Sequence, residues 1–348
     1  MESITSSRAK NLALVVGGSI VGALLGIGIY EIVENVRYYQ WRNSFGGTAW
    51  LGSVTVPSED PELMWEYRPH AQHKRIRTNQ HGFRGADVPI EKPSGVIRVA
   101  FVGDSVTLGY GEELENIFVE VFVREAALLD LARSVEGLNF GIDGYATPQI
   151  ARMVESRVLP FEPDHVVYVM CLNDFDFTTS AGEKVLYFRK PRSFFLGKME
   201  HLLRKLRGHD FHTHKFLKNR GETYEHILRM RDGTEGVGAR FQLVLLPIFP
   251  RPVHSFAAYP HQDIHDHVRA FAAENGIAFL DLLDEMRARG GPPRAYANDV
   301  WHPNPDGHRV IGETLLRVLE GDRRGASGKV DLPLSDSPSP APGEGAGG

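Results

Sequence analysis

The chain has almost no cysteine and no strong excess of either charge. A single cysteine in 348 residues, Cys171, excludes an internal disulfide framework. The formal net charge of −5 gives no electrostatic preference for nucleic acid, so we expect no nucleic-acid partner. Two common enzyme motifs are also missing: the Gly-x-Ser-x-Gly elbow and the Gly-x-x-x-x-Gly-Lys-Ser/Thr phosphate loop. The composition is instead that of a globular protein that buries an ordinary apolar core.

One long apolar run lies near the N-terminus. Between Leu12 and Ile29, Ser19 is the only side chain that is neither apolar nor glycine. At about 1.5 Å per residue such a helix can cross a hydrocarbon layer of roughly 30 Å. The polar sequence from Glu31 to Arg37 is a poor signal-peptide cleavage site. We therefore expect an uncleaved anchor helix over 11–33, with membrane contact through 11–30, after a short tail over 1–10.

The orientation of this single-pass anchor is not decided by charge. Arg8 and Lys10 precede the run, and Arg37 and Arg42 follow it, so the two flanks carry equal positive charge. A very short N-terminus ahead of a large C-terminal part fits a signal anchor. We therefore expect the rest of the chain to be extracytoplasmic, in a periplasm or at a cell surface.

Three glycines recur at every fourth residue inside the run: Gly18, Gly22 and Gly26. Their spacing places them along one helix face, where two helices could approach closely in a homodimer. Glycine is also simply common in membrane helices. Both interpretations remain open.

The remaining chain alternates apolar runs with stretches of helical spacing. The runs that predict strands are 96–102, 138–142, 166–170, 241–248 and 277–282. Helical spacing is found over 114–133, 148–159, 261–275 and 305–319. Fully apolar strands alternating with amphipathic helices predict an α/β protein, a three-layer α/β/α sandwich with a mostly parallel five-stranded sheet. In such sheets the ligand site lies beyond the carboxyl ends of the strands.

Composition divides the chain further. Residues 34–60 are predicted to be a juxtamembrane connector, and 61–322 one globular domain. Residues 323–348 contain too few large apolar side chains to order themselves, so we expect a disordered tail. A long insertion, 178–239, separates the third and fourth predicted strands.

This insertion is basic and amphipathic. Residues 184–220 carry eleven Lys and Arg but only two acids. Apolar side chains recur there at helical spacing: Phe195, Met199, Leu202, Leu203 and Leu206. Three interpretations remain open. The helix could lie on an anionic membrane surface, pack on the core with a solvated basic face, or form a lid over a site.

Polar residues follow several of the predicted strands. Ser105 comes directly after the first strand, Gly144 after the second and Asn173 after the third. Asp299 and His302 follow the fifth strand and the helix after it. Each residue alone could cap a helix or form a turn. Together they should converge on one edge of the sheet.

In order and rough spacing, these blocks resemble the SGNH (GDSL-like) hydrolase superfamily, named for Ser, Gly, Asn and His. The similarity spans about 96–320 and implies a flavodoxin-like fold. One departure stands in the third block, which usually begins with glycine but here reads Cys171-Leu172-Asn173-Asp174. A segment containing Glu66–Pro69 and Asn79–Gly85 is similar to one in membrane-tethered bacterial relatives. We expect that segment to pack against the sheet.

The resemblance implies a role for each residue. Ser105 would be the nucleophile, His302 its base, and Asp299 the acceptor that orients the imidazole. The backbone N–H groups of Ser105 and Gly144 and the amide of Asn173 would form the oxyanion hole. This chemistry predicts a membrane-anchored esterase acting through an acyl-serine intermediate on a small-molecule, carbohydrate or lipid ester. A carbohydrate O-acyltransferase or deacetylase, a lysophospholipase or lipase, and a non-catalytic scaffold remain alternatives.

Two histidine pairs could in principle hold a metal ion, His212 with His214 and His261 with His265. No cysteine or clear catalytic acid completes a known zinc pattern around them. We therefore predict that these histidines are solvated, and that the protein uses neither a metal nor another cofactor.

Overall fold

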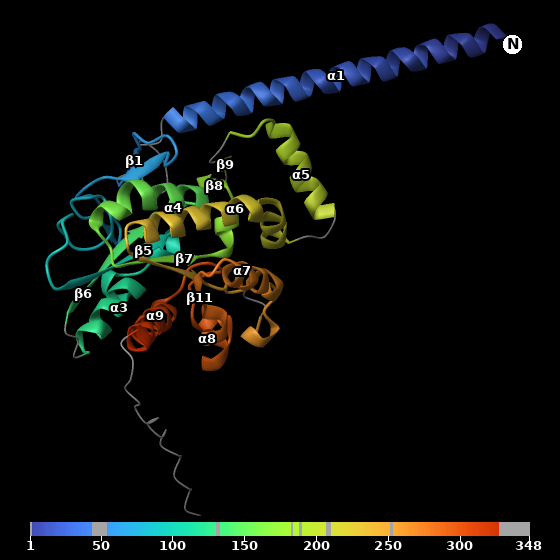
Figure 1. Cartoon of the computed structure of the whole chain (residues 1–348). Helices are drawn as coiled ribbons and strands as arrows, with labels where there is room; N and C mark the ends of the chain where they lie inside the picture. Colours follow the sequence, from blue (N-terminus) through green and yellow to red (C-terminus); the bar gives the residue numbers. More distant parts are fainter. Residues whose placement is uncertain are drawn as a thin grey trace, which may run out of the picture.

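The structure is a computed structural model that describes residues 2–43, 54–129, 133–181, 184–187, 190–206, 210–250 and 253–326. Helix α1 (Glu2–Asn43) projects from the body as one straight element (Figure 1). Its segment Asn11–Gln40 is long and apolar enough to cross a membrane, a test that a signal sequence would also pass. The helix continues through 34–43, part of the predicted connector. Residues 44–53 and most of the predicted disordered tail, from 327 on, lie outside the described residues.

The body is built on one five-stranded parallel sheet. Its strands are β5 (Val96–Gly103), β6 (Ser134–Gly141), β7 (His165–Met170), β10 (Arg240–Leu245) and β11 (Ala278–Asp281). They pair in the order β11-β10-β7-β5-β6, all parallel. The strand order reverses between β5 and β7, which is where such sheets hold their ligands. The predicted fold class is confirmed.

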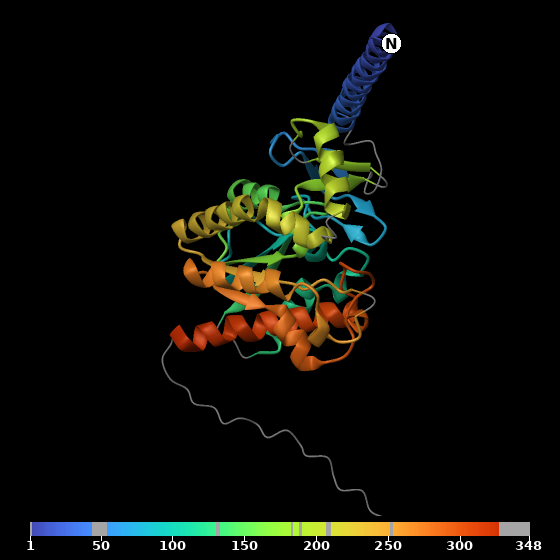
Figure 2. The same ribbon diagram turned by 90° about the vertical axis from the view of Figure 1, so that its right-hand side faces the viewer.

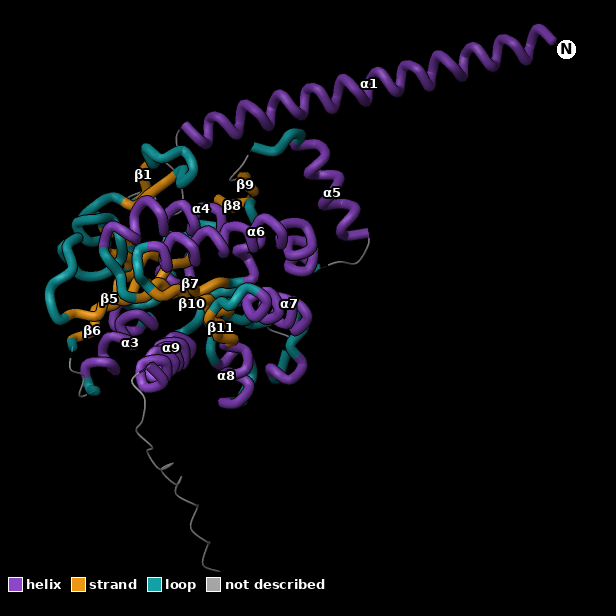
Figure 3. Tube along the Cα trace, viewed as in Figure 1, coloured by secondary structure: helices purple, strands orange, loops and turns teal. Residues whose placement is uncertain are grey.

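Helices cover both faces of the sheet (Figures 1 and 3). They are α3 (Phe118–Ala127), α4 (Thr147–Met153), α6 (Phe211–Gly236), α7 (Gln262–Glu274), α8 (Leu282–Arg289) and α9 (Pro305–Ala326). Helices α4 and α6 lie over one face, α3, α8 and α9 over the other, and α7 packs beside β11. Both faces of the strands are therefore buried, which explains their continuous apolar sequences.

Some boundaries differ from the prediction. Strand β6 begins four residues before Leu138, because as an edge strand it includes half-exposed polar residues such as Glu136. Within the described part of 114–133, where helical spacing was found, only α3 is α-helix. Short 3₁₀ or π turns occupy Leu114–Asn116, Val154–Val158, Leu159–Phe161, Leu172–Phe175, Phe256–Ala258 and Pro293–Ala295.

An N-terminal segment, residues 54–85, wraps one end of the sheet. It contains β1 (Thr55–Pro57), β2 (Trp65–Tyr67), β3 (Gln72–His73) and β4 (Ile76–Arg77), arranged as two small antiparallel pairs. Trp65 is fully buried and its carbonyl accepts the hydroxyl of Tyr145. The predicted packing of this segment against the sheet domain is confirmed.

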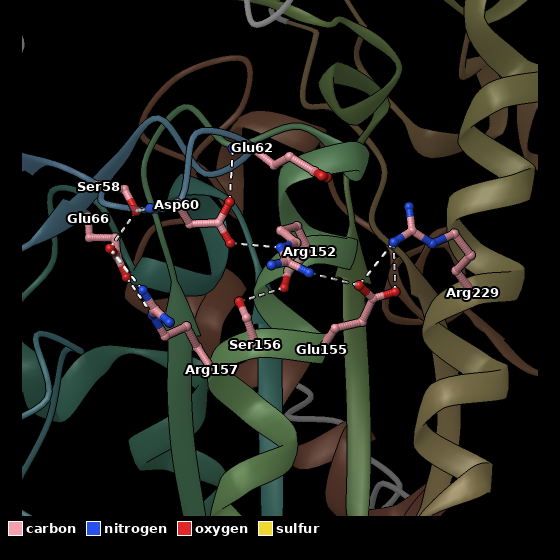
Figure 4. A network of polar contacts seen from close by, with 9 residues as sticks. All are labelled: Ser58, Asp60, Glu62, Glu66, Arg152, Glu155, Ser156, Arg157 and Arg229. Atoms are coloured by element: carbon pink, nitrogen blue, oxygen red, sulfur yellow. Dashed lines mark hydrogen bonds and ion pairs between the residues drawn. The ribbon is translucent and has the colours of Figure 1, made fainter.

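Ion pairs attach the same segment to the helical layer (Figure 4). Arg157 pairs with Glu66 at 2.7 Å, and Arg152 pairs with Asp60 at 2.7 Å. Burial raises the pKa of Asp60, but the hydrogen bonds from Arg152 and from the Glu62 N–H and the nearby arginine charges together outweigh burial, so the net pKa is lowered. Partly exposed pairs contribute at most about 1 kcal/mol each, so the buried aromatic contacts carry most of this docking.

Residues 178–239 are only partly an insertion. The hairpin β8 (Thr178–Ala181) and β9 (Lys184–Tyr187) and helix α5 (Phe194–Leu206) are additions to the sheet domain. Helix α6, in contrast, buries Phe216, Ile227 and Met230 against the core. Helix α6 is the crossover that connects the parallel strands β7 and β10, so it is part of the sheet domain itself and not an addition to it.

Candidate active site

The turn after β5 carries Ser105 at the carboxyl edge of the sheet. Ser105 opens the short helix α2 (Ser105–Leu108), which Asp104 caps by accepting the N–H of Val106 at 2.9 Å. Helix α2 packs tightly on β6, where a Cβ on Gly141 would overlap the backbone of Leu108. The glycine therefore allows the close approach that holds Ser105 in place.

His302 reaches Ser105 from the loop before α9. Its Nε2 lies 3.0 Å from the Ser105 Oγ, and its Nδ1 lies 2.8 Å from Oδ2 of Asp299. The other carboxylate oxygen of Asp299 accepts the backbone N–H groups of Trp301 and His302, each at 2.8 Å. One loop thus fixes both groups, and the structure brings all three predicted residues into direct contact.

The charges of this cluster act on one another. Burial lowers the pKa of His302, but the hydrogen bond and negative charge of Asp299, together with the charges of Asp104 and Asp143, outweigh burial, so the net pKa is raised. Burial raises the pKa of Asp299, yet the hydrogen bonds from His302 and Trp301 and the charge of His302 together lower it to about 2. The carboxylate is therefore ionised at neutral pH and favours the imidazolium over the neutral ring.

The predicted oxyanion donors surround the same turn. The Asn173 amide nitrogen donates to Asp104 Oδ2 at 2.6 Å, which joins Asn173 to the Ser105 turn. A primary amide has a second N–H, which leaves one donor for a ligand. Gly144 has φ +80°, a conformation that L side chains rarely adopt. The hydroxyl of Tyr67, from the N-terminal segment, accepts the N–H of Asp143 next to Gly144.

The departure at Cys171 leaves the third block in place. Cys171 is buried, and burial raises the pKa of its thiol. Its backbone N–H donates to the Asp174 carboxylate at 3.0 Å, and the Tyr168 hydroxyl donates to the same carboxylate at 2.9 Å. Burial raises the pKa of Asp174 as well. These contacts fix the turn that carries Asn173.

Sequence reasoning missed Arg84, which stabilises the turn after Ser105 by hydrogen bonds to its carbonyl groups. Its guanidinium donates to the carbonyls of Leu108 at 2.8 Å, Gly109 at 2.6 Å and Glu112 at 2.6 Å. The side chain is almost fully buried, and burial lowers its pKa to about 10, so it stays charged at neutral pH. Arg84 satisfies the carbonyls that end α2.

Glu112 extends this support to the histidine loop. Its carboxylate accepts the side-chain amide of Asn298 at 2.6 Å, one residue before Asp299. Arg84 holds the backbone of Glu112, and Glu112 holds the loop of Asp299 and His302. The Ser105 turn and the His302 loop are therefore tied together through a path separate from their direct contact. The Gly82-Phe83-Arg84 pattern was visible in the sequence, but its target carbonyls were not.

Replacing Arg84 by methionine should lower the free energy of unfolding by about 2–4 kcal/mol, because several buried carbonyls lose a charged donor. We expect kcat toward a soluble ester to fall with it. Thermal unfolding and ester hydrolysis measure the two effects. Arg77→Met is the matched control, since Arg77 lies in the same segment and is exposed. Equal unfolding midpoints for the two variants would contradict the role of Arg84.

The prediction that the paired histidines are solvated is wrong for three of the four residues. His212, His261 and His265 are buried. The ring of His212 packs on Trp301 with centroids 4.6 Å apart, and His265 Nδ1 lies 2.8 Å from Asp281. Helices α6 and α7 turn these side chains inward, which residue spacing alone did not reveal. No group of three potential metal ligands occurs among the described residues.

A family model described as GDSL-like lipase/acylhydrolase matches residues 101–310, more than half of the chain. The match includes every predicted site residue. The chain is therefore a hydrolase of ester bonds. More specifically, it belongs to the GDSL-like lipase/acylhydrolase family.

Several solved structures are similar to this chain at low sequence identity. A lipolytic G-D-S-L family protein from Veillonella parvula is 16% identical, with a TM-score of 0.41 over 65% of this chain and 98% of its own. A lipase/acylhydrolase from Enterococcus faecalis is 18% identical, with a TM-score of 0.43 over 65% and 96%. An acetyl xylan esterase is 15% identical, with a TM-score of 0.44 over 64% and 100%. No curated protein sequence matches the chain.

Proposed function

We propose that the chain is a membrane-anchored esterase that cleaves acyl esters through an acyl-Ser105 intermediate. The observation that carries this proposal is the continuous contact from Ser105 Oγ through His302 to Asp299, at 3.0 and 2.8 Å. It lies at the carboxyl edge of the sheet beside the reversal of strand order, where this architecture holds ligands.

In the proposed reaction, the Ser105 Oγ attacks the ester carbonyl carbon while its proton passes to His302 Nε2. The carbonyl oxygen becomes an oxyanion. Collapse of this intermediate breaks the bond to the alcohol, which leaves with the proton from His302. Water then attacks the acyl-serine, gives its proton to His302, and releases the acid as Ser105 recovers its proton. Asp299 holds the ring in the tautomer that both steps need.

The proposed oxyanion hole consists of the N–H groups of Ser105 and Gly144 and the free amide N–H of Asn173. These donors follow three different strands, β5, β6 and β7, and the proposal requires that they be in place before substrate binds. Preorganised donors are the main source of stabilisation for such an intermediate, and each is worth about 100- to 1000-fold in rate.

The substrate class is tested with the full chain in detergent. We expect release of p-nitrophenol from short-chain esters, and the same samples are assayed on acetylated sugars and on lysophospholipid. Preference for an acetylated sugar would favour the deacetylase alternative, and transfer of the acyl group to an added sugar the acyltransferase. If no ester turned over above the level of Ser105→Ala, the esterase proposal would fail and the scaffold alternative would stand.

The proposed anchor is the apolar part of α1, with the hydrolase domain on the extracytoplasmic side. Its side chains are exposed along the helix, as a lipid-facing helix requires. A Cβ added at Gly18, Gly22 or Gly26 would meet no atom of another described element within 4 Å, so their face is open to a second copy. Full-length protein should remain with membranes in alkaline carbonate, and its release would contradict the anchor.

A further inference from the structure

Helix α5 starts where the apolar run of α1 ends. Glu31, two residues beyond Ile29, accepts the backbone N–H groups of Phe194 and Phe195 at 3.1 and 2.8 Å. The Ser193 hydroxyl donates to the same carboxylate, and the rings of Tyr38 and Phe194 pack with centroids 6.2 Å apart. The first turn of α5 is therefore fixed to α1 at the level where a membrane-spanning segment would leave the hydrocarbon.

A second contact, at Glu200 near the middle of α5, fixes the helix to the body. Glu200 receives His214 at 2.8 Å and Lys218 at 2.6 Å, both from α6. Helix α5 lies between α1 and α6, and it runs across α1 rather than along it (Figures 1 and 2). The rest of the body lies beyond α5, on the side of the C-terminal half of α1. A bilayer around residues 12–29 would thus have α5 at its surface.

The remaining face of α5 is an exposed apolar stripe. Five side chains, each between 36% and 75% exposed, form it: Leu196, Met199, Leu202, Leu203 and Leu206. At 100° per residue they fall within about one third of the helix circumference, and Glu200 borders this stripe beside Leu196. Lys198 and Arg192 are exposed nearby. An apolar stripe bordered by cations is the pattern of a helix that lies in the headgroup region of a bilayer.

We propose that α5 is a second membrane contact, with its apolar stripe buried at the boundary between headgroups and acyl chains beside the exit of α1. This inference rests on the proposed anchor. It selects one of the three interpretations of the basic segment, because the contacts to α1 and α6 leave the apolar stripe exposed. Such a helix typically sinks about 5–10 Å into the interface. Two contacts would hold the body in one orientation over the lipid.

The test uses the full chain in vesicles of phosphatidylcholine and phosphatidylglycerol. Cys171 is the only cysteine and is buried, so a polarity-sensitive fluorophore can be attached to an introduced thiol. The probe is Leu202→Cys on the stripe. The matched control is Leu128→Cys, an exposed leucine at the end of α3. The anchor is monitored separately with Ile20→Cys. Lipids spin-labelled near the glycerol end of the acyl chain serve as quenchers for position 202, and lipids spin-labelled near its methyl end for position 20.

We expect a blue-shifted emission at position 202 and quenching several-fold stronger than at position 128. Quenching at 20 but not at 202 would overturn the α5 contact and leave the anchor intact. A lack of quenching at both 20 and 202 would overturn the anchor and α5 together. A blue shift at 202 that depends on protein density in the bilayer, without lipid quenching, would assign the stripe to a second copy of the chain and overturn the proposal.

Discussion

Replacing Ser105 by alanine is expected to lower kcat for ester hydrolysis by about 10⁵- to 10⁶-fold. The loss should be this large because without the Oγ no acyl-enzyme forms, and only binding and oxyanion stabilisation remain. KM should change little, since the side chain is small and the pocket is otherwise unaltered. Steady-state hydrolysis of a p-nitrophenyl ester measures both parameters.

The matched control is Ser94→Ala, since Ser94 is exposed and precedes the same strand. It should hydrolyse the ester at the wild-type rate. A fluorophosphonate should label the wild-type chain and Ser94→Ala at Ser105, and should leave Ser105→Ala unlabelled. A label found on another residue, or full activity in Ser105→Ala, would assign the nucleophile elsewhere.

Replacing Asp299 by asparagine should lower kcat by about 10⁴-fold while leaving the fold intact. The new amide can donate to His302 Nδ1, which stabilises the tautomer with the proton on the wrong nitrogen. Asp306→Asn is the control, because Asp306 lies four residues after His302 and pairs only with the exposed Arg309 among the described residues. Its rate should match wild type.

The pH profile gives an independent readout of the same pair. In the wild type, the hydrogen bond and charge of Asp299, together with the charges of Asp104 and Asp143, outweigh burial and raise the pKa of His302 above its ordinary value. Activity needs the neutral ring, so kcat/KM should fall as the pH drops through this raised pKa. In Asp299→Asn the residual activity should persist to lower pH, because the pKa of His302 falls once the hydrogen bond and charge of Asp299 no longer oppose burial. An unchanged profile would mean that Asp299 does not control the ionisation of His302.

Much of this arrangement could be predicted because parallel strands end at a common edge. Buried strands are continuous apolar runs, so β5, β7 and β10 could be located from the sequence. Ser105 and Asn173 follow two of them, and their proximity required only the fold class. The contact between His302 and Asp299 is local, three residues apart, and lies within reach of sequence reasoning.

Contacts between distant segments could not be found in this way. Arg84 donates to carbonyls that follow it by more than twenty residues, and Glu112 meets Asn298 across almost the whole domain. Backbone carbonyls carry no residue code, so no sequence pattern identifies them as a target. The buried histidines were misassigned for a related reason. Whether His265 faces water or Asp281 depends on the packing of α7.

The support that Arg84 and Tyr67 give to the site has a consequence for defining this enzyme. The recognisable family region begins at residue 101, whereas the two residues that hold its nucleophile and glycine turns belong to the segment 54–85. The region that matches the family model is therefore shorter than the part of the chain whose contacts support the site. A fragment that began at residue 101, where the family match starts, would keep every predicted catalytic group. It would lose the contacts from Arg84 and Tyr67 that hold the turns carrying these groups in place.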